Sequence, residues 1–529
     1  MKNSLNNLLN FGLAAGCLGL TQGSTVLPAD KEQNPNVLFI SIDDLRPELG
    51  CYGNPVIRTP NLDRLASMGM VFTKTFCQVA VSAPSRASLF TGLRPDSVHV
   101  WGLEDKFRNT MPDVKTLPKY LHQYGYYTVG IGKIFHNFMP DSVSFDEPDL
   151  RPDAYKTPDR ILRDAESFHY DEAITQRQRE IREAKIKKNP AARQYADGWG
   201  YGSSVEVFEG PDSVLYDGAQ TELAIRTLSR LKNSDQPFFM ALGYYRPHLP
   251  FVAPRKYFDL YDPSTIPLAA NPFLPADAPV MAADNQYELA ACYDLAYVKH
   301  PRGFTLCPDS ARILKQGYYA SVSYVDACIG RLMQEMDKMG LLENTVIVVW
   351  GDNGWKLGEH NSWTKQTNYN IDTRVPLIIY TPDLKKRGKT CSRLTELVDL
   401  FPTVCELAKV KMPDYAQGTS LVPLLKDPAR PWKPAVFSQF HRKPNITPDK
   451  KRYMGYSMVT PEYHYVEWRY WDYEKKLPGE RVAMELYDLS RDPDENHNLA
   501  VKPEYAETLT QLAAQMKAGW KSARPVSVR

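Results

Sequence analysis

The sequence predicts an α/β fold in which a large, mixed and mostly parallel sheet is flanked by helices and followed by a smaller C-terminal domain. Nearly continuous apolar runs at 36–42, 237–243 and 345–350 are typical of strands buried on both faces. Segments with helical periodicity separate these runs, and this alternation favours a parallel sheet covered by helices. The C-terminal part contains short alternating runs instead, which predict a small antiparallel sheet with a final helix.

The individual elements follow from the same patterns. A helix begins at Pro60, because Thr59 can cap it and proline suits a first helical turn. Further helices are predicted at 117–124, 171–188, 216–231, 313–339, 394–407 and 504–522. Further strands are predicted at 127–131 and 375–380 in the large sheet, and at 435–440, 452–460, 463–471 and 483–488 in the small one. The proline-rich segment 261–310 is expected to be a loop-rich insertion over the functional face.

Length and composition set the domain organisation. The chain of 529 residues can fill two domains, and we place a large domain at 31–428 and a C-terminal subdomain at 432–529. The net charge of +2 provides no positive field that would attract nucleic acid. The eight cysteines include no CxxC pair, which argues against a zinc ribbon and favours buried thiols.

The first residues predict export. Lys2 precedes an apolar run that is too short to cross a membrane, so residues 1–23 have the pattern of a signal peptide. The segment 13–17 (LAAGC) also matches a bacterial lipobox, which would place a lipid anchor on Cys17. Cleavage of an ordinary leader near Gly23 or near Ala29 is the alternative, and both stay open. We therefore expect a bacterial protein that crosses the inner membrane and is periplasmic or lipid-anchored, with no transmembrane span.

Polar side chains follow four of the predicted strands. In open α/β sheets ligands bind at the carboxyl ends of the strands, so these groups are expected to converge. Three carboxylates and an amide oxygen would then surround a hard cation, and oxygen ligands favour calcium or magnesium over zinc. Taken singly, the acidic pair could be a solvated turn and each histidine a core residue. The groups are Asp43 and Asp44, Lys133 and His136, His248, and Asp352 and Asn353.

A serine stands at the start of another helix. Pro84 suits a first helical turn, and Ser82 lies just ahead of it, where free backbone N–H groups and the helix dipole favour an anion. Such a position suits a group that holds or attacks an anion. An ordinary helix-capping serine is the alternative.

The surrounding string decides between these alternatives. The pattern Ser-x-Pro-Ser-Arg at 82–86, followed by Thr-Gly-x-Arg-Pro at 91–95, resembles the signature of the type I sulfatases. The resemblance extends over almost the whole mature chain and includes 485–489 (ELYDL) and Asp492-Pro493. Several segments resemble the iduronate 2-sulfatases and bacterial glycosaminoglycan uronate 2-O-sulfatases in particular: 43–47 (DDLRP), 50–53 (GCYG), 132–136 (GKIFH), 243–250 (GYYRPHLP), 320–324 (ASVSY), 357–360 (LGEH) and 454–457 (MGYS).

The resemblance implies an alkaline-phosphatase-like fold and a site built around a modified residue. Ser82 would be converted to formylglycine (3-oxoalanine) by a maturation enzyme, and the hydrated aldehyde would attack sulfur. The implied catalytic residues are Ser82, Arg86, Lys133, His136, His248 and Lys365. One Ca²⁺ ion would be held by Asp43, Asp44, Ser82, Asp352 and Asn353. The candidate substrate contacts are His360, Trp363 and Arg246, with Arg442 and Lys443 as further cations for a sugar carboxylate.

Each residue has an implied role. The cations would neutralise the sulfate oxygens, while His248 and Lys365 would protonate the leaving sugar oxygen and His136 would release the sulfate. Two positions depart from the animal enzymes: Ser82 stands where they carry cysteine, and Asn353 where the animal relative has histidine. The first departure implies the bacterial, serine-competent maturation system, and a serine that is left unmatured stays open as the alternative.

The implied activity is hydrolysis of a 2-O-sulfate ester from uronic acid at the end of heparin, heparan sulfate or chondroitin sulfate oligosaccharides, that is, glycosaminoglycan degradation. One alternative is a sulfatase for another sulfated carbohydrate. A second is a phosphate or phosphonate monoester hydrolase of the same superfamily, and a third is a non-catalytic sugar-binding lipoprotein. The catalytic residues do not by themselves choose the sugar.

Overall fold

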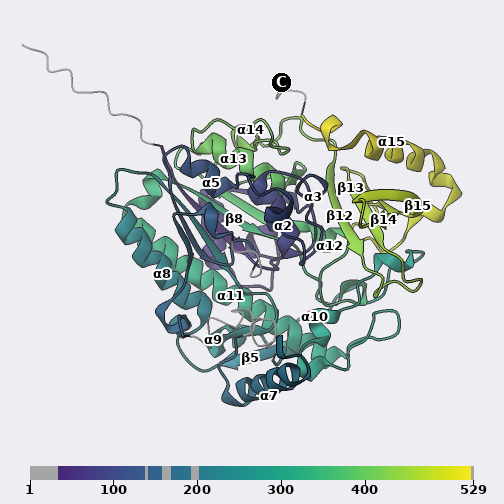
Figure 1. Cartoon of the computed structure of the whole chain (residues 1–529), viewed down its shortest axis with the longest axis horizontal. Coiled ribbons are helices and arrows are strands. Elements are labelled where there is room, and N and C mark those ends of the chain that lie inside the picture. Colours follow the sequence, from purple (N-terminus) through teal and green to yellow (C-terminus); the bar gives the residue numbers. More distant parts are fainter. Residues whose placement is uncertain (1–33, 137–140, 158–167, 192–201, 526–529) are drawn as a thin grey trace, which may run out of the picture. The chain divides into compact units, whose positions relative to one another are not determined.

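The computed structural model describes residues 34–136, 141–157, 168–191 and 202–525, and its main feature is a nine-stranded sheet (Figure 1). The predicted signal peptide and Cys17 lie outside the described residues. The strand order is β10-β2-β9-β8-β1-β6-β3-β4, with β11 paired to β2. The bounds are β1 Asn36–Ile42, β2 Met70–Phe76, β3 Tyr127–Gly132, β4 Glu147–Leu150, β6 Phe238–Tyr244, β8 Thr345–Gly351, β9 Arg374–Tyr380, β10 Lys389–Cys391 and β11 Thr395–Glu396.

The sheet is mostly parallel, as predicted. β1 runs parallel to β6 and β8, and β3 runs parallel to β6. Strand β9 is antiparallel to both of its neighbours, β8 and β2. All residues of β6 and β8 are buried, which explains why their sequences are apolar throughout instead of alternating.

Two apolar cores cover the two faces of the sheet. Along β1, Leu38 and Ile40 belong to one core, whereas Val37 and Phe39 belong to the other. Helices α1 (Pro60–Met68), α8 (Tyr216–Leu231) and α11 (Pro308–Lys338) supply side chains to the first core. Helices α2 (Ser82–Thr91), α5 (Leu117–His122) and α13 (Leu400–Leu407) supply side chains to the second.

Some predicted bounds are wrong. Helix α11 begins at Pro308 instead of 313, because proline takes a first helical position after the extended residue Cys307. The helix predicted at 394–407 begins only at Leu400. Thr395 and Glu396 form β11, and Glu396 and Asp399 then form a capping box across a short 3₁₀ turn. Strands β2, β4, β10 and β11 of the large sheet were not predicted.

The C-terminal part contains the predicted antiparallel sheet and helix. Its strands pair in chain order, β12-β13-β14-β15, and helix α15 (Ala506–Ser522) follows. Gln439 N donates to Gln78 O over 2.8 Å, which joins β12 to the segment that precedes α2. Residues Pro35–Arg529 form one compact unit, and the domain boundary near 428–432 stays a prediction. The bounds are β12 Val436–Arg442, β13 Tyr453–Val459, β14 Tyr463–Asp472 and β15 Leu477–Asp488.

The remaining elements are short, apart from the charged surface helix α7 (Glu172–Lys188), which begins after Asp171 as predicted. Strands β5 (Val205–Phe208) and β7 (Phe251–Pro254) form a separate parallel pair. The short helices are α3 Pro95–Val98, α4 Phe107–Thr110, α9 Arg255–Phe258, α10 Tyr287–Ala290, α12 Asn370–Thr373 and α14 Val422–Lys426. Among the described residues, none of the helices is long and apolar enough to cross a membrane. The cysteines of the described ranges are all free, and most of them are buried, as predicted.

Candidate active site

The ends of three parallel strands lie level at one edge of the large sheet. Ile42 of β1 pairs with Tyr244 of β6 and with Gly351 of β8. The residues that follow β1 and β8 therefore leave the sheet side by side. This register is the reason that two acidic segments separated by three hundred residues of chain can meet.

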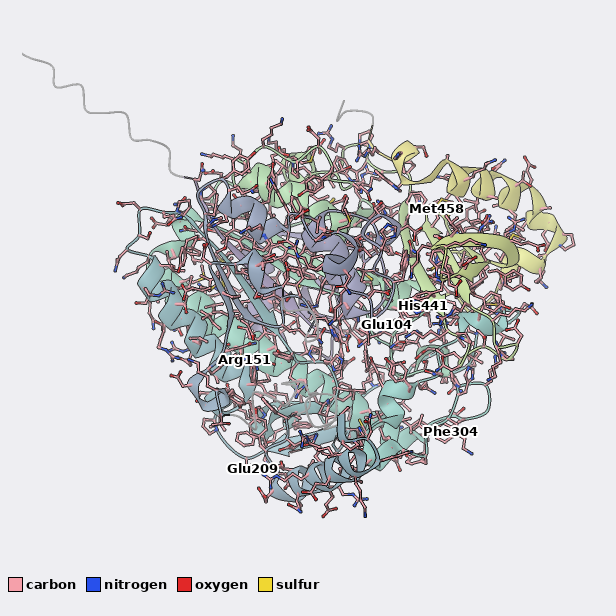
Figure 2. The ribbon with its side chains drawn as sticks, viewed as in Figure 1. Glu104, Arg151, Glu209, Phe304, His441 and Met458 are labelled. Carbon is pink, nitrogen blue, oxygen red and sulfur yellow. The ribbon has the colours of Figure 1, made fainter. Side chains whose placement is uncertain are left out.

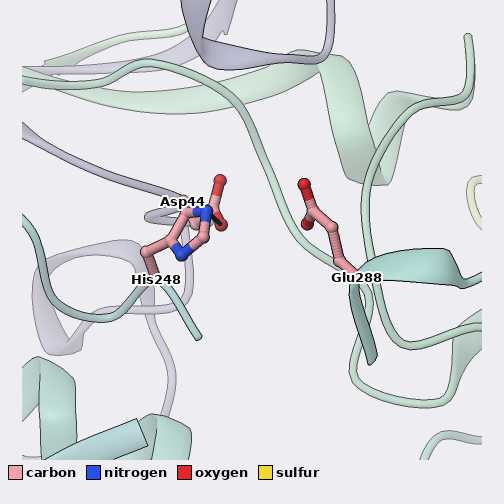
Figure 3. A group of neighbouring side chains, drawn as sticks. All are labelled: Asp44, His248 and Glu288. Carbon is pink, nitrogen blue, oxygen red and sulfur yellow. Dashed lines mark ion pairs between the residues drawn. The ribbon is translucent and has the colours of Figure 1, made fainter. Parts of the chain in front are cut away.

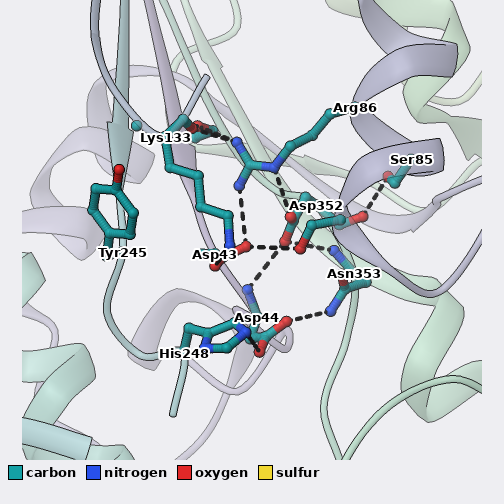
Figure 4. A network of polar contacts seen from close by, with 12 residues as sticks. Asp43, Asp44, Ser85, Arg86, Lys133, Tyr245, His248, Asp352 and Asn353 are labelled. Atoms are coloured by element: carbon teal, nitrogen blue, oxygen red, sulfur yellow. Dashed lines mark hydrogen bonds and ion pairs between the residues drawn. The ribbon is translucent and has the colours of Figure 1, made fainter. Parts of the chain in front are cut away.

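Three buried aspartates meet at this edge (Figure 4). Asp43, Asp44 and Asp352 each offer a carboxylate oxygen, and these oxygens lie within 4.8 Å of one another. Asp44 N donates to Asp352 Oδ1 over 3.0 Å, and Asn353 Nδ2 donates to Asp44 Oδ1 over 2.7 Å. Asp44 has φ +55°, in the left-handed region that few non-glycine residues adopt. The sequence-predicted acidic residues are thus brought together.

Ser82 faces the same cluster from helix α2. It is the first residue of the helix, after the extended residue Val81, so it is not the capping residue itself. Its Oγ donates to Asp43 Oδ1 over 3.0 Å. Ser85, one helical turn later, donates from Oγ to the backbone oxygen of Asp352. These two bonds tie the start of α2 to the ends of both acidic strands.

Three cations are paired with the three carboxylates. Arg86 donates from Nε to Asp352 Oδ2 over 2.8 Å and from Nη2 to Asp43 Oδ1 over 3.2 Å. The Lys133 ammonium donates to Asp43 Oδ2, and the Lys365 ammonium lies 2.7 Å from Asp44 Oδ2. All three cationic side chains are at most 2% exposed, so their charges act in a dry environment where electrostatic interactions are strong.

His248 approaches the cluster from the loop after β6. Its Nδ1 lies 2.7 Å from the backbone oxygen of Leu249, and since a carbonyl can only accept, Nδ1 carries the proton. Nε2 then points toward Asp44 Oδ2, 3.6 Å away. Arg246 donates from Nη1 to the His248 backbone oxygen, and Asp217 accepts from the Arg246 backbone N–H. The imidazole is therefore held in one orientation, with a proton on Nδ1.

The comparisons with known proteins agree with this arrangement. The family model described as "Sulfatase" matches residues 35–410, about seven tenths of the chain. The chain belongs to the sulfatase family. A second model, for the C-terminal part of N-sulphoglucosamine sulphohydrolase, matches residues 358–521 of this sulfatase.

The relatives of this sulfatase include carbohydrate sulfatases. It is 31% identical to iduronate 2-sulfatase of Homo sapiens over 93% of this chain and 96% of the relative. One solved structure, of a protein in complex with its substrate D-glucosamine-2-N,6-O-disulfate, matches with a TM-score of 0.67 and 24% identity over 94% of this chain and 100% of the other. The phosphonate monoester hydrolase of Agrobacterium radiobacter matches with a TM-score of 0.68 and 22% identity over 92% of this chain and 95% of the other. These structural matches confirm the alkaline-phosphatase-like fold.

Burial and neighbouring charges act in opposite directions on the acidic residues of the sulfatase. Burial would raise the pKa of Asp43, but the charges of Lys133, His248 and Arg86 hold that pKa well below its ordinary value. Burial raises the pKa of Asp44 to about 6, against the opposing effect of Lys365. The pKa values of these two neighbouring carboxyl groups are thus shifted in opposite directions.

The same opposition sets the charge of Lys365. Burial alone would lower the pKa of its ammonium, but the carboxylates of Asp44 and Glu288 hold it well above the ordinary value. Lys365 is therefore a fixed positive charge at neutral pH.

The donor set fits a hard metal ion, which the sulfatase family uses together with formylglycine. Asn353 Oδ1 is buried and accepts no hydrogen bond from any described residue. Leaving a buried acceptor unpaired costs free energy, and a cation at this position would satisfy it. Asp43, Asp44, Asp352 and the Ser82 hydroxyl add further oxygen atoms close by. An all-oxygen set of this kind matches calcium or magnesium better than zinc.

The other sequence-predicted residues lie in different surroundings. His136 follows Lys133 at the end of β3, with its side chain buried. The His360 Nε2 donates to Asp494 O over 2.8 Å, and Trp363 packs in the apolar core beside α11. No contact in the described part of the chain joins these two side chains to the aspartate cluster, so their role as substrate contacts stays a prediction.

The two cations predicted in the C-terminal sheet, Arg442 and Lys443, differ in their exposure to solvent. Arg442 is fully buried and donates to the backbone oxygens of Met281, Gln366 and Ala282, so its guanidinium is committed to the fold. The Lys443 side chain is 37% exposed and pairs with Glu104 over 2.9 Å. Figure 2 shows Glu104 next to His441, at the contact between β12 and the loop after α3.

Three residues of the site were missed by sequence reasoning. Glu288 reaches Lys365 from the 261–310 segment, Asp217 holds the loop that carries His248, and Gln366 bonds to the segment before Ser82. Glu288 lies in a loop-rich segment without periodicity, and Asp217 lies in the first turn of an ordinary amphipathic helix. Of these three, only Gln366 could have been indicated by the sequence, because it directly follows the predicted catalytic residue Lys365.

Proposed function

We propose that this sulfatase removes a 2-O-sulfate group from a uronic acid at the end of a heparin, heparan sulfate or chondroitin sulfate oligosaccharide. The observation that carries the reaction type is the contact of Ser82 Oγ with Asp43 inside a buried cluster of three carboxylates and three cations. Identity of 31% to human iduronate 2-sulfatase over 93% of the chain supports the choice of substrate. Another sulfated carbohydrate is the main alternative, and its support is the match to the protein solved with a glucosamine disulfate.

The cations have a direct role in this proposal. A sulfate ester resists hydrolysis because its charged oxygens shield the sulfur and because an alkoxide is a poor leaving group. Arg86, Lys133 and Lys365 are fixed on Asp43 and Asp44 before any substrate arrives, so their positive charges need no reorganisation. They would bind the sulfate oxygens and stabilise the negative charge that grows on them.

Two groups complete the proposed site. A maturation enzyme would convert Ser82 to formylglycine, which supplies a nucleophilic hydroxyl in its hydrated form. Asp43, Asp44, Asp352 and Asn353 would hold a calcium ion, which supplies further positive charge against the sulfate oxygens.

The histidines move protons in the proposed reaction. His248 already carries a proton on Nδ1, so it donates to the leaving sugar oxygen from Nε2 when the ring is doubly protonated. Asp44, 3.6 Å from Nε2, stabilises that imidazolium. Lys365 lies on the same carboxylate and assists this protonation. His136 takes up a proton from the hydroxyl of the modified residue when sulfate is released.

The expected location of the enzyme completes the proposal. We propose export by the segment 1–23 and a periplasmic position, either soluble or lipid-anchored at Cys17. Mass spectrometry of the membrane and periplasmic fractions distinguishes the two, because a lipidated Cys17 becomes the first residue.

The test is the pattern of desulfation. The full-length enzyme, co-expressed with a serine-type maturation enzyme, is incubated with disaccharides that carry a 2-O-, 6-O- or N-sulfate, and the products are separated by chromatography. Loss of the 2-O-sulfate alone is expected, faster on disaccharides than inside long chains. Loss of another sulfate with the 2-O-sulfate intact would refute the substrate. Matched aryl sulfate and aryl phosphate esters test the reaction type, because a faster phosphate reaction would refute the sulfatase activity.

A further inference from the structure

The loop-rich segment 261–310 brings a buried acid to the proposed catalytic centre. Glu288 lies in helix α10 and is 4% exposed. Its Oε2 lies 3.2 Å from Lys365 Nζ. One of its carboxylate oxygens also lies within 4.8 Å of ligand atoms of Asp44 and His248 (Figure 3). This acid therefore faces Lys365 and His248, the two residues that act on the leaving group in the proposed reaction.

The cation that belongs among these groups is Lys365 itself. An aspartate, a histidine and a glutamate at this spacing could hold a second metal ion. However, the Lys365 ammonium lies 2.7 Å from Asp44 and 3.2 Å from Glu288, with the Trp355 ring centroid 5.0 Å away. Two carboxylates and an aromatic face thus surround one ammonium group.

The neighbouring residue Gln366 fixes Lys365 from the other side. Gln366 has φ +77°, a strained conformation for a residue other than glycine, and such strain concentrates at functional sites. Its N–H donates to Ala80 O over 3.2 Å, just before Ser82. Its Nε2 donates to the Tyr287 hydroxyl over 3.0 Å and to Glu288 Oε1 over 3.4 Å. Helix α10 therefore contacts both side chains of the 365–366 pair.

We propose that Glu288 is a positioning residue that holds the Lys365 ammonium in its catalytic orientation. The proposal rests on the catalytic role of Lys365 given above. Asp44 is shared, because it also accepts from Asn353 and faces His248. Glu288, in contrast, contacts Lys365 and its chain neighbour Gln366. Glu288 is thus the partner that can fix the direction of the Lys365 side chain whatever else Asp44 binds.

Substitution of Glu288 measures this effect. Glu288→Gln keeps the size of the side chain and removes its charge, so kcat is expected to fall about 10- to 100-fold while KM changes less than about threefold, because a small misplacement of a catalytic group lowers the rate strongly. Glu288→Asp keeps the charge on a shorter side chain, and its kcat is expected to lie between those of the wild type and Glu288→Gln. The aspartate variant also covers the case in which the glutamine variant does not fold.

A double-mutant cycle distinguishes positioning from a structural role. If Glu288 acts through Lys365, the pair Glu288→Gln with Lys365→Ala should have a kcat within about threefold of Lys365→Ala alone. Asp284→Asn is the matched control, because Asp284 anchors the same segment by accepting from Thr364 Oγ1 over 2.6 Å. Its effect on kcat is expected to multiply with that of Lys365→Ala. Thermal unfolding of each variant verifies the fold.

The outcomes separate this inference from the proposed function. Full activity of Lys365→Ala would overturn the catalytic role of Lys365, and the role of Glu288 with it. Loss of activity in Lys365→Ala, combined with a Glu288→Gln variant within about twofold of wild type, would overturn the inference alone. If the losses in kcat of Glu288→Gln and Lys365→Ala multiply in the double variant, the inference would also be overturned.

Discussion

Replacing Glu396 by glutamine should destabilise the fold by about 3 kcal/mol at neutral pH, because this buried carboxylate compensates two buried cations. Arg94 donates to both of its oxygens, over 2.8 and 2.7 Å, and Lys433 Nζ lies 2.7 Å from Oε2. The backbone N–H of Phe437 in β12 also donates to Oε1 over 3.0 Å. Glu396 thus joins the segment after α2 to the first strand of the small sheet.

The magnitude follows from the pKa of this carboxyl group. Burial would raise the pKa of Glu396, but Arg94 and Lys433 lower it from 4.5 to about 2. This difference corresponds to about 3 kcal/mol at pH 7. Because the folded-state pKa is the lower one, the stabilisation is present above pH 4.5 and is lost as the pH falls toward 2. At pH 4 part of this stabilisation is already lost.

Urea unfolding followed by tryptophan fluorescence measures this difference. The gap between wild type and Glu396→Gln should be about 3 kcal/mol at pH 7 and smaller at pH 4. Glu335→Gln on the surface of α11 is the control, and no measurable change is expected because Glu335 pairs with the solvent-exposed Arg331 and Lys338. The reasoning would be refuted if Glu396→Gln lowers the free energy of unfolding by less than about 1 kcal/mol at pH 7. It would also be refuted if the difference between wild type and variant is larger at pH 4 than at pH 7.

Three further predictions concern the site. Ser82→Ala should abolish turnover and leave the unfolding transition nearly unchanged, since little packing is lost; activity near wild type in a matured preparation would contradict the role of Ser82. EDTA treatment, with metal loss verified by elemental analysis, should remove activity and calcium should restore it, whereas Asp352→Asn should weaken calcium binding; full activity of the metal-free protein would contradict the metal role. His248→Asn should lower kcat about 10²- to 10⁴-fold on sugar sulfates but much less on nitrophenyl sulfate, whose leaving group needs no proton; equal losses on both would contradict a role in protonation.

The positions of the metal and anion groups could be predicted because strand register sets them. Asp43 and Asp352 directly follow buried parallel strands, and the apolar runs that mark those strands are long enough to locate their ends. In a parallel sheet the carboxyl ends share one edge, so the convergence follows from the strand pattern alone. Ser82 was recognised from its motif, and helix α2 then places it against Asp43.

The parts that were missed depend on tertiary contacts without a local pattern. Strand β2 pairs with β9 through a register irregularity between Phe72 and Thr75, so it has no regular alternation. The 394–407 segment carries helical spacing throughout, yet Thr395 bonds to Thr75 in β2 across the sheet over 2.8 Å. That pairing competes with helix formation and delays the start of α13 to Leu400. Local periodicity cannot reveal either outcome.

Arg442 shows why the recognition of the sugar is harder to predict than the reaction chemistry. Its sequence neighbourhood, a cation at the end of a strand in the C-terminal part, suits a partner for a uronate carboxylate. In the structure the guanidinium instead crosses from β12 to bond the backbone oxygens of Met281 and Ala282 in the 261–310 segment, and that of Gln366 beside Lys365. The same residue therefore supports the segment that carries Glu288. The reaction chemistry is placed by strand ends, whereas the groups that adjust it arrive from segments whose positions depend on buried contacts such as these.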